Sequence, residues 1–202
     1  MNKFTRKVVL LSIALMFFYV YTSVNAAPSE ENDGPRFTND EKLIKPDNYR
    51  QWILIGTGLG MVYGPLAATL GGHPSFTNVF VNPSAYHHFL QSGSWPDKTI
   101  LLLEIRESIA LNNSATGGNG YYQGELIGME AHVKDERRFK GGWAFFGLSD
   151  TQPTGTHIPE TADCYACHAA NAAVDTTFVQ FYPVLRDIAK QKATFGKVPS
   201  AF

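Results

Sequence analysis

Apolar runs in the middle of the chain predict four β-strands. Each run is rich in aromatic and β-branched residues, which favour strands, and polar or glycine-rich segments separate the runs. The runs are Phe76–Val81, Thr99–Arg106, Tyr121–Lys134 and Trp143–Leu148. The segment Asn112–Gly120, rich in glycine and asparagine, predicts a turn between the second and third strands. Because the last three strands follow one another without a helical pattern, we expect an antiparallel sheet.

Two helices are predicted around the first strand. Asp47–Ile55 begins with an acidic residue and continues with apolar ones, so we interpret it as a short helix. Asn82 and Pro83 predict the start of a second helix, with Asn82 as its cap and Pro83 at the first helical position. This helix should extend to about Ser92 and end at Gly93.

The C-terminal part of the chain is predicted to be helical after a loop. Thr151–Asp163 contains two prolines and predicts the loop. The alanine-rich sequence that follows continues a helical pattern to Tyr182; Pro183 ends or kinks it, and Val184–Lys192 adds a last turn or two. The pattern as a whole predicts an α+β fold with a large antiparallel sheet and a few helices.

The N-terminus has the layout of a secretory signal peptide. Lys3, Arg6 and Lys7 precede the apolar run Val8–Val20, and small residues lead up to Ala26. The apolar run is about 13 residues long, short of the roughly 20 that cross a bilayer as a helix. We therefore expect residues 1–26 to be removed and the protein to be periplasmic, with an uncleaved anchor as the alternative.

The rest of the chain is long enough for one domain. Residues 27–45 are polar and are interpreted as a loose leader, and residues 46–202 as the folded domain. Without the signal, 14 basic and 18 acidic residues remain, a net charge of −4. A mildly acidic chain without a basic run favours neither nucleic acid nor anionic lipid as a partner.

The two cysteines of the chain belong to one short motif, Cys164-Tyr165-Ala166-Cys167-His168. This is the C-x-x-C-H pattern of covalent haem attachment. On a helical turn both thiols lie on one side and reach the haem vinyl groups, and His168 becomes the axial ligand of the iron. The alternatives are a disulfide, a thioredoxin-like redox pair, which would follow a βαβ pattern that is absent, or a zinc site, for which only His157 is near. We predict one haem c.

The second axial position of the iron separates two functions. A methionine or histidine there would make an electron carrier, whereas an open position would bind small molecules. The candidates outside the signal are Met61, Met129, His73, His87, His88, His132 and His157. Composition does not choose among them.

The glycine-rich segment Gly56-Thr57-Gly58-Leu59-Gly60 invites comparison with a dinucleotide-binding loop. The third glycine of that fingerprint would fall at Met61, and no βαβ unit follows. We therefore do not expect nucleotide binding.

Four segments in series resemble the cytochrome P-460 family, over about Asn48 to Leu185. They are FTNVFVNPSAYHHFLQSGSWPDKTILLLEIRES, GNGYYQGELIGMEAHVKDERRF, GGWAFFGLSD and CYACHAANAAVDTTFVQFYPVL. The resemblance implies a small periplasmic haem protein with a large antiparallel sheet, the haem being held by a C-terminal helix. It also implies a homodimer and a redox partner protein.

One position departs from the family pattern. Hydroxylamine oxidation in this family depends on a lysine bonded to the haem edge, and the matching residue here is Leu103, just before Glu104. Lys98 lies in the preceding turn, too early in the strand to replace it. The resemblance therefore implies the cytochrome c′-β branch, whose open site binds nitric oxide or reacts with peroxide. Hydroxylamine oxidation and plain electron transfer are the alternatives.

The resemblance also implies an acidic residue above the iron, and Glu130 is the nearest match. Strand alternation would put His132 on the same face as Glu130, so both are candidate catalytic residues, with an exposed sheet edge as the alternative for each. A carboxyl group in an apolar haem pocket should have a raised pKa, which suits proton transfer. Leu103 is expected to contact the haem, and aromatic strand residues to wall the pocket, namely Phe76, Phe80, Trp143, Phe145 and Phe146.

Overall fold

The computed structural model describes residues 32–61, 74–111 and 120–198. The chain divides into two units, residues 1–32 and residues 33–202, and the second unit is described below. The predicted signal peptide and most of the predicted turn at 112–120 lie outside the described residues. Within the described ranges no helix has both the length and the apolar character needed to span a membrane.

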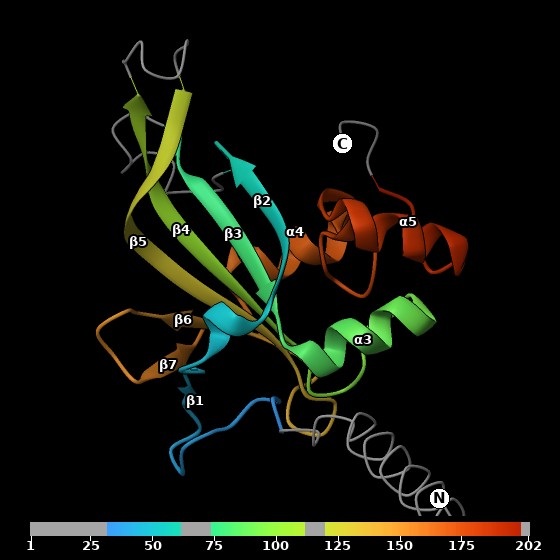
Figure 1. Cartoon of the computed structure of the whole chain (residues 1–202). Coiled ribbons are helices and arrows are strands. Elements are labelled where there is room, and N and C mark those ends of the chain that lie inside the picture. The colour runs from blue at the N-terminus through green and yellow to red at the C-terminus, as the bar shows by residue number, and fades with distance from the viewer. Residues whose placement is uncertain (1–31, 62–73, 112–119, 199–202) are drawn as a thin grey trace, which may run out of the picture. The chain divides into compact units, whose positions relative to one another are not determined.

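The second unit is built on a seven-stranded sheet in the order β1-β7-β6-β5-β4-β3-β2, and every neighbouring pair is antiparallel (Figure 1). The four predicted strands are confirmed as its centre and form β3, β4, β5 and β6. The bounds are β1 Leu43–Ile44, β2 Ile53–Leu59, β3 Phe76–Val81, β4 Ile100–Leu111, β5 Gly120–Lys134, β6 Trp143–Leu148 and β7 Thr154–His157.

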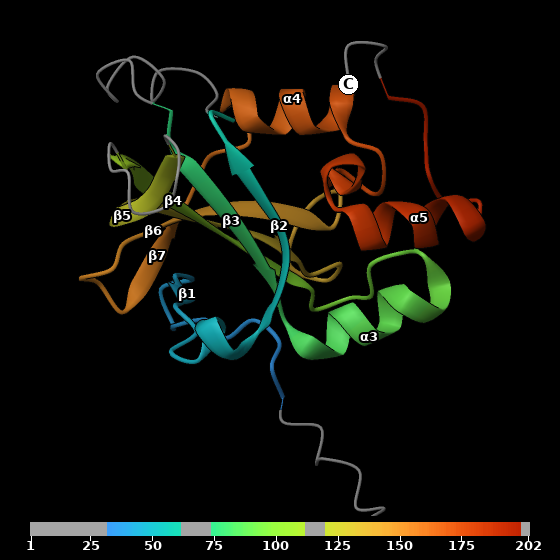
Figure 2. The same cartoon turned by 45° about the horizontal axis from the view of Figure 1, so that its top comes forward.

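Within the described residues three α-helices accompany the sheet, which confirms the α+β class. They are α3 Pro83–Ser92, α4 Asp163–Asn171 and α5 Pro183–Gln191, and the short 3-10 turns are η1 Tyr49–Gln51 and η3 Val179–Phe181. The three helices lie on the same side of the sheet, with α3 against α5 (Figures 1 and 2). The predicted end of α3 is confirmed, because Gly93 has a φ of 75° and its N–H donates to the carbonyl of Phe89.

Two apolar layers form on the two faces of the sheet. On the helical side, α3 and α5 pack against β3 and β4 through Phe89, Leu185, Val81 and Leu101. On the other side, the segment around β1 and η1 covers a second layer that includes Phe146 of β6. The sheet therefore has apolar residues on both faces, and α4 lies on the same side as α3 and α5 (Figures 1 and 2).

The helix predicted at Asp47–Ile55 is wrong. Its first part is the single 3-10 turn η1, and its second part enters β2, which pairs with β3 at the edge of the sheet. Ile53 and Ile55 pack against the helical-side core as strand residues. Pairing with β3 therefore outweighs a weak helical pattern that runs directly into glycines.

The described part of the expected loose leader is folded onto the sheet. Leu43 of β1 is fully buried and pairs with Gly155 of β7, a strand inside the segment predicted as a loop. Asp33, also from the leader, accepts a hydrogen bond from the N–H of Ser84 at 2.8 Å in the first turn of α3. Asn82 takes the predicted N-cap position of that helix and Pro83 begins it, but the Asn82 side chain makes no capping hydrogen bond, because its Oδ1 accepts from the N–H of Ile100.

The long helix predicted from Asp163 to Tyr182 is also wrong. α4 ends at Asn171, and the chain then makes a tight turn in which Val174 and Thr177 form a β-bridge. Helix resumes only as η3 and then α5, which begins at Pro183. Alanine-rich sequence favours helix throughout this region, but the turn returns the chain toward α4.

Candidate functional site

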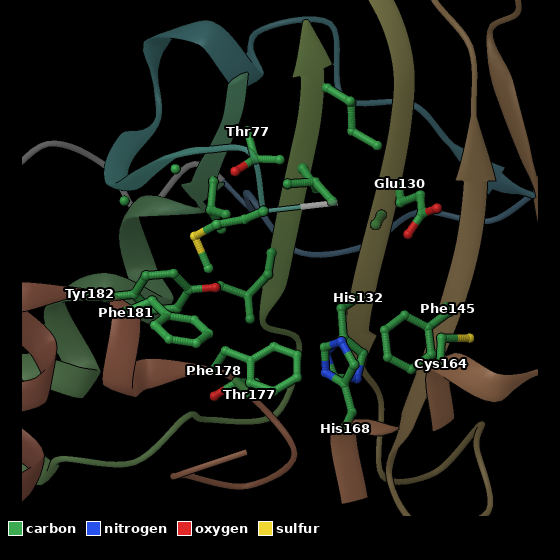
Figure 3. Close-up of a pocket in the computed structure, with 18 of the residues that line it drawn as sticks. Thr77, Glu130, His132, Phe145, Cys164, His168, Thr177, Phe178, Phe181 and Tyr182 are labelled. Atoms are coloured by element: carbon green, nitrogen blue, oxygen red, sulfur yellow. The ribbon is translucent and has the colours of Figure 1, made fainter. Parts of the chain in front are cut away.

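A cavity of about 700 Å³ lies between the helical face of the sheet and the segment from α4 to Tyr182 (Figure 3). Its size is that of a site for a cofactor or a small organic ligand. Its walls are mainly apolar, and β4 contributes Leu101, Leu103 and Ile105. Two carboxyl groups, those of Glu130 and Asp163, are among the described lining residues, and none of these residues is a lysine or arginine.

Helix α4 presents the cysteine motif to this cavity. Cys164, Cys167 and His168 all line it, whereas Ala166 between them is exposed. Residues three apart lie on one side of a helix, so the predicted arrangement of the two thiols is present. The two sulfurs are free thiols and are not bonded to each other. Burial raises the pKa of the Cys164 thiol, and the nearby Glu130 carboxylate adds to this effect.

His168 is held in one orientation by the backbone. Its Nδ1 lies 2.7 Å from the carbonyl oxygen of Thr176, which can only accept, so Nδ1 carries the proton. The lone pair is then on Nε2, the arrangement that second-shell hydrogen bonds give to metal-binding histidines. Burial lowers the pKa of His168, with the Thr176 carbonyl opposing it, so the ring is held neutral.

The turn that carries the Thr176 carbonyl is unusual. Asp175 and Thr176 have φ angles of 47° and 59°, a left-handed conformation that costs free energy for a β-branched residue such as threonine. Side chains fix it from two sides: Trp95 Nε1 donates to Thr177 Oγ1 at 2.8 Å, and Lys134 Nζ lies 2.7 Å from the Asp175 carboxylate. The carbonyl that orients His168 therefore sits in an anchored turn.

His132 lies against the ring of His168. The ring centroids are 5.1 Å apart, and His132 also stacks on Phe145 at 4.0 Å with an interplanar angle of 9°. The side chain lines the cavity and is almost fully buried, yet neither ring nitrogen has a hydrogen-bond partner among the described residues. Burial, with a contribution from His168, lowers its pKa well below the ordinary value, so the ring is neutral.

Glu130 and Leu103 face each other across the β4–β5 ladder and both line the cavity. The expected common face for Glu130 and His132 is therefore confirmed, although His132 sits beside His168. Burial raises the pKa of the Glu130 carboxyl. Lys98 is not a lining residue; its Nζ is 2.6 Å from the Asp135 carboxylate.

Three of the expected wall residues, Phe76, Phe80 and Phe146, are on the wrong face of the sheet. Alternation along β3 puts Thr77 and Val79 in the cavity wall, whereas Phe76 and Phe80 point to the opposite side, where Phe80 packs on Tyr49 with centroids 5.7 Å apart. Likewise Phe145 lines the cavity while its neighbour Phe146 is in the opposite apolar layer. Trp143 contacts the ring of His132 but is not among the lining residues.

The glycine-rich segment belongs to the site for a steric reason. A Cβ atom at Gly56 would lie 2.7 Å from the ring of Tyr182, and one at Gly58 would lie 2.5 Å from Sδ of Met61. Both glycines, Tyr182 and Met61 line the cavity, whereas the other candidate methionine, Met129, is buried in the opposite apolar layer. Tyr182 is a site residue that the sequence analysis does not predict. The available signal is the group of aromatic residues after the cysteine motif, Phe178, Phe181 and Tyr182, which all line the cavity.

The fold and the site define a class: an α+β protein whose antiparallel sheet and C-terminal helices enclose an apolar cavity with a thiol pair and an oriented imidazole. The sequence model of the Cytochrome P460 family matches residues 46–179, about two thirds of the chain. The chain belongs to the cytochrome P460 family, which implies haem and its iron as the cofactor. A search of curated proteins found no match.

The residues of the cavity fit a haem group. The two thiols and His168 Nε2 are the donors that c-type attachment uses, and aromatic and aliphatic side chains form the walls. In addition, burying the two ring nitrogens of His132 without hydrogen-bond partners is energetically unfavourable, and a polar group bound in the cavity could supply a partner. The cavity thus has both the apolar lining and the polar atoms that the cofactor requires.

Proposed function

We propose that the chain is a periplasmic, mono-haem c-type cytochrome with an open site for small ligands such as nitric oxide or peroxide. The observation that carries this proposal is the geometry at His168. Its Nδ1 is tied to Thr176, Nε2 is left to bind iron, and both thiols of the motif line the same apolar cavity. Cys164 and Cys167 hold the haem covalently.

When bound, the haem supplies an iron that takes a small ligand at its open position. The chain supplies the surroundings. Leu101, Leu103 and Ile105 present apolar side chains that exclude water from the ligand. The Glu130 carboxyl, whose pKa burial raises, holds a proton more readily than an exposed glutamate and can deliver it to a ligand within the cavity.

Reaction with nitric oxide or peroxide is favoured over hydroxylamine oxidation. The family's hydroxylamine chemistry depends on a lysine bonded to the haem. The resemblance puts Leu103, a residue of the cavity wall, at the matching position. Lys98, in the turn before β4, is instead paired with Asp135. A leucine at this position is therefore our reason for proposing the activity of the cytochrome c′-β branch over hydroxylamine oxidation.

Met61 gives the electron-transfer alternative a specific basis, because its thioether is in the cavity wall. An absorption spectrum of the ferrous protein distinguishes an open ligand-binding site from electron transfer and from hydroxylamine oxidation. An open, high-spin iron, which we expect, lacks sharp α and β bands. Sharp bands would indicate a sixth protein ligand, and a Met61→Leu variant that removes them would identify it. Distorted and shifted bands would indicate a lysine cross-link and hydroxylamine oxidation.

The assembly and the cellular setting follow from the resemblance and from the N-terminal sequence. We propose a homodimer that exchanges electrons with a redox partner protein after export and removal of residues 1–26. Sedimentation of the mature protein measures its oligomeric state, and we expect the mass of a dimer.

A further inference from the structure

The hydroxyl group of Tyr165, inside the cysteine motif, completes the pairing of two strands of the sheet. Next to the β6–β7 ladder, the N–H of Ile158 donates to the carbonyl of Phe145 at 2.8 Å. In an antiparallel pair of this kind the two residues exchange two hydrogen bonds. The second is relayed by Tyr165: the N–H of Phe145 donates to Oη at 3.1 Å, and Oη donates to the carbonyl of Ile158 at 3.1 Å.

The same hydroxyl group is also close to a histidine. Nε2 of His157 is 3.3 Å from Oη. A tyrosine hydroxyl has one proton and two lone pairs, so it can donate to Ile158 and accept from both Phe145 and His157. Burial raises the pKa of the Tyr165 phenol. The Tyr165 hydroxyl group therefore makes all its hydrogen bonds with Phe145, His157 and Ile158, at the end of the β6–β7 ladder, which is called the β6–β7 edge below.

Helix α4 contacts the sheet through the rings of Tyr165 and His168. None of its residues is fully buried. The ring of Tyr165 packs edge-on against Phe145 with centroids 4.9 Å apart. Phe145 in turn contacts His168, with centroids 4.7 Å apart, and stacks on His132. A change at the Tyr165 hydroxyl group would thus reach the rings around His168 through Phe145.

We propose that Tyr165 is a positioning residue that docks the cysteine-bearing helix on the β6–β7 edge. By fixing Phe145, it sets the packing around His168 and holds the two thiols at the cavity. The docking part stands on the described contacts alone. The part that concerns the iron rests on the proposed function.

Tyr165→Phe tests the docking, because phenylalanine keeps the ring and removes only the hydroxyl group. The N–H of Phe145 and the carbonyl of Ile158 then lose their partners. Hydrogen–deuterium exchange that resolves single amides, on the full mature protein, should show exchange at Phe145 at least about tenfold faster. Tyr121→Phe, the same change at a half-exposed tyrosine of β5, should leave that amide unchanged. Unchanged protection in Tyr165→Phe would overturn the proposal.

A second readout tests the link to the iron. In the ferrous protein, the iron–histidine stretching band in the resonance Raman spectrum should shift or broaden in Tyr165→Phe and not in Tyr121→Phe. If exchange at Phe145 is faster in Tyr165→Phe but the iron–histidine band is unaltered, Tyr165 docks the helix but does not position His168. If the wild-type protein carries no haem, the proposed function fails, while the exchange experiment still gives its answer on docking.

Discussion

Replacing Glu130 by glutamine is expected to slow the reaction of the ferric protein with hydrogen peroxide by at least about tenfold. The substitution keeps the size of the side chain and removes its titratable proton. Cleavage of the peroxide bond needs a proton at the departing oxygen, and positioned acid–base groups contribute about 10² to 10⁴-fold to such steps. Burial already raises the pKa of the Glu130 carboxyl, which brings it closer to the working range of a proton donor. Stopped-flow spectroscopy measures the rate.

Nitric oxide provides the internal control for this variant. Its binding to ferrous iron needs no proton, so the affinity should change little in Glu130→Gln. Glu125→Gln, at an exposed position on the same strand, should alter neither reaction. If Glu130→Gln leaves the peroxide reaction at the wild-type rate, Glu130 has a structural role only.

Replacing Glu104 by glutamine is expected to lower the free energy of unfolding by about 2 to 3 kcal/mol. This carboxylate is buried on the face of the sheet opposite the cavity. Tyr49 Oη donates to it at 2.6 Å, and Arg50 and Arg106 form ion pairs with it at 3.0 Å each. Arg106 is itself mostly buried, so the substitution removes the partner of a poorly solvated charge. Urea unfolding of the haem-loaded protein near pH 7 measures the change.

The effect of this substitution should depend on pH. Burial opposes ionisation of Glu104, but hydrogen bonds from Arg106, Tyr49 and Arg50 outweigh it and lower its pKa from 4.5 to about 2. Because the folded state binds the proton less readily than the unfolded state, the carboxylate stabilises the fold fully above pH 4.5. The difference between wild type and variant should then shrink as the pH falls toward about 2. Glu107→Gln, at an exposed position on the same strand, should change stability by less than about 0.5 kcal/mol at any pH.

The central strands could be predicted from the sequence because their signal is local. Phe76–Val81 and Trp143–Leu148 are dense in aromatic and β-branched residues between turn segments, and their bounds agree with β3 and β6. The edge strands lack such a signal. β7 is four residues with one buried position, and it exists because Gly155 pairs with Leu43, more than a hundred residues away in the sequence. Pairing over that separation leaves no periodic pattern in either segment.

The candidate site divides in the same way. The placement of Cys164, Cys167 and His168 on one side of α4 follows from their spacing and from helical geometry, so it could be predicted from the sequence. The prediction that Leu103 and Glu130 line the same cavity rested on the family resemblance. Phe76 and Phe80 were placed wrongly because neighbouring strand residues point to opposite faces, and composition does not say which face is which.

Other parts of the site depend on tertiary contacts that no short motif encodes. Thr176 orients His168 through a backbone carbonyl, which is independent of side-chain identity. Gly56 matters because Tyr182 packs against it from the other end of the chain. Tyr165 stands at a variable position of the attachment motif, and only the structure brings its hydroxyl group to the β6–β7 edge.

Mass spectrometry after acid–acetone extraction shows whether the haem is covalently bound. Thioether bonds survive this extraction, so the haem should stay with the polypeptide, and the intact mass should equal the chain from Ala27 plus one haem. Trypsin should then release a single haem peptide, Gly141–Arg186, which contains Cys164, Cys167 and His168. A second peptide bonded to that haem, above all one carrying a lysine, would restore hydroxylamine oxidation as the main function. Free haem in the organic phase, with an unmodified polypeptide, would show that Cys164 and Cys167 do not bind haem covalently.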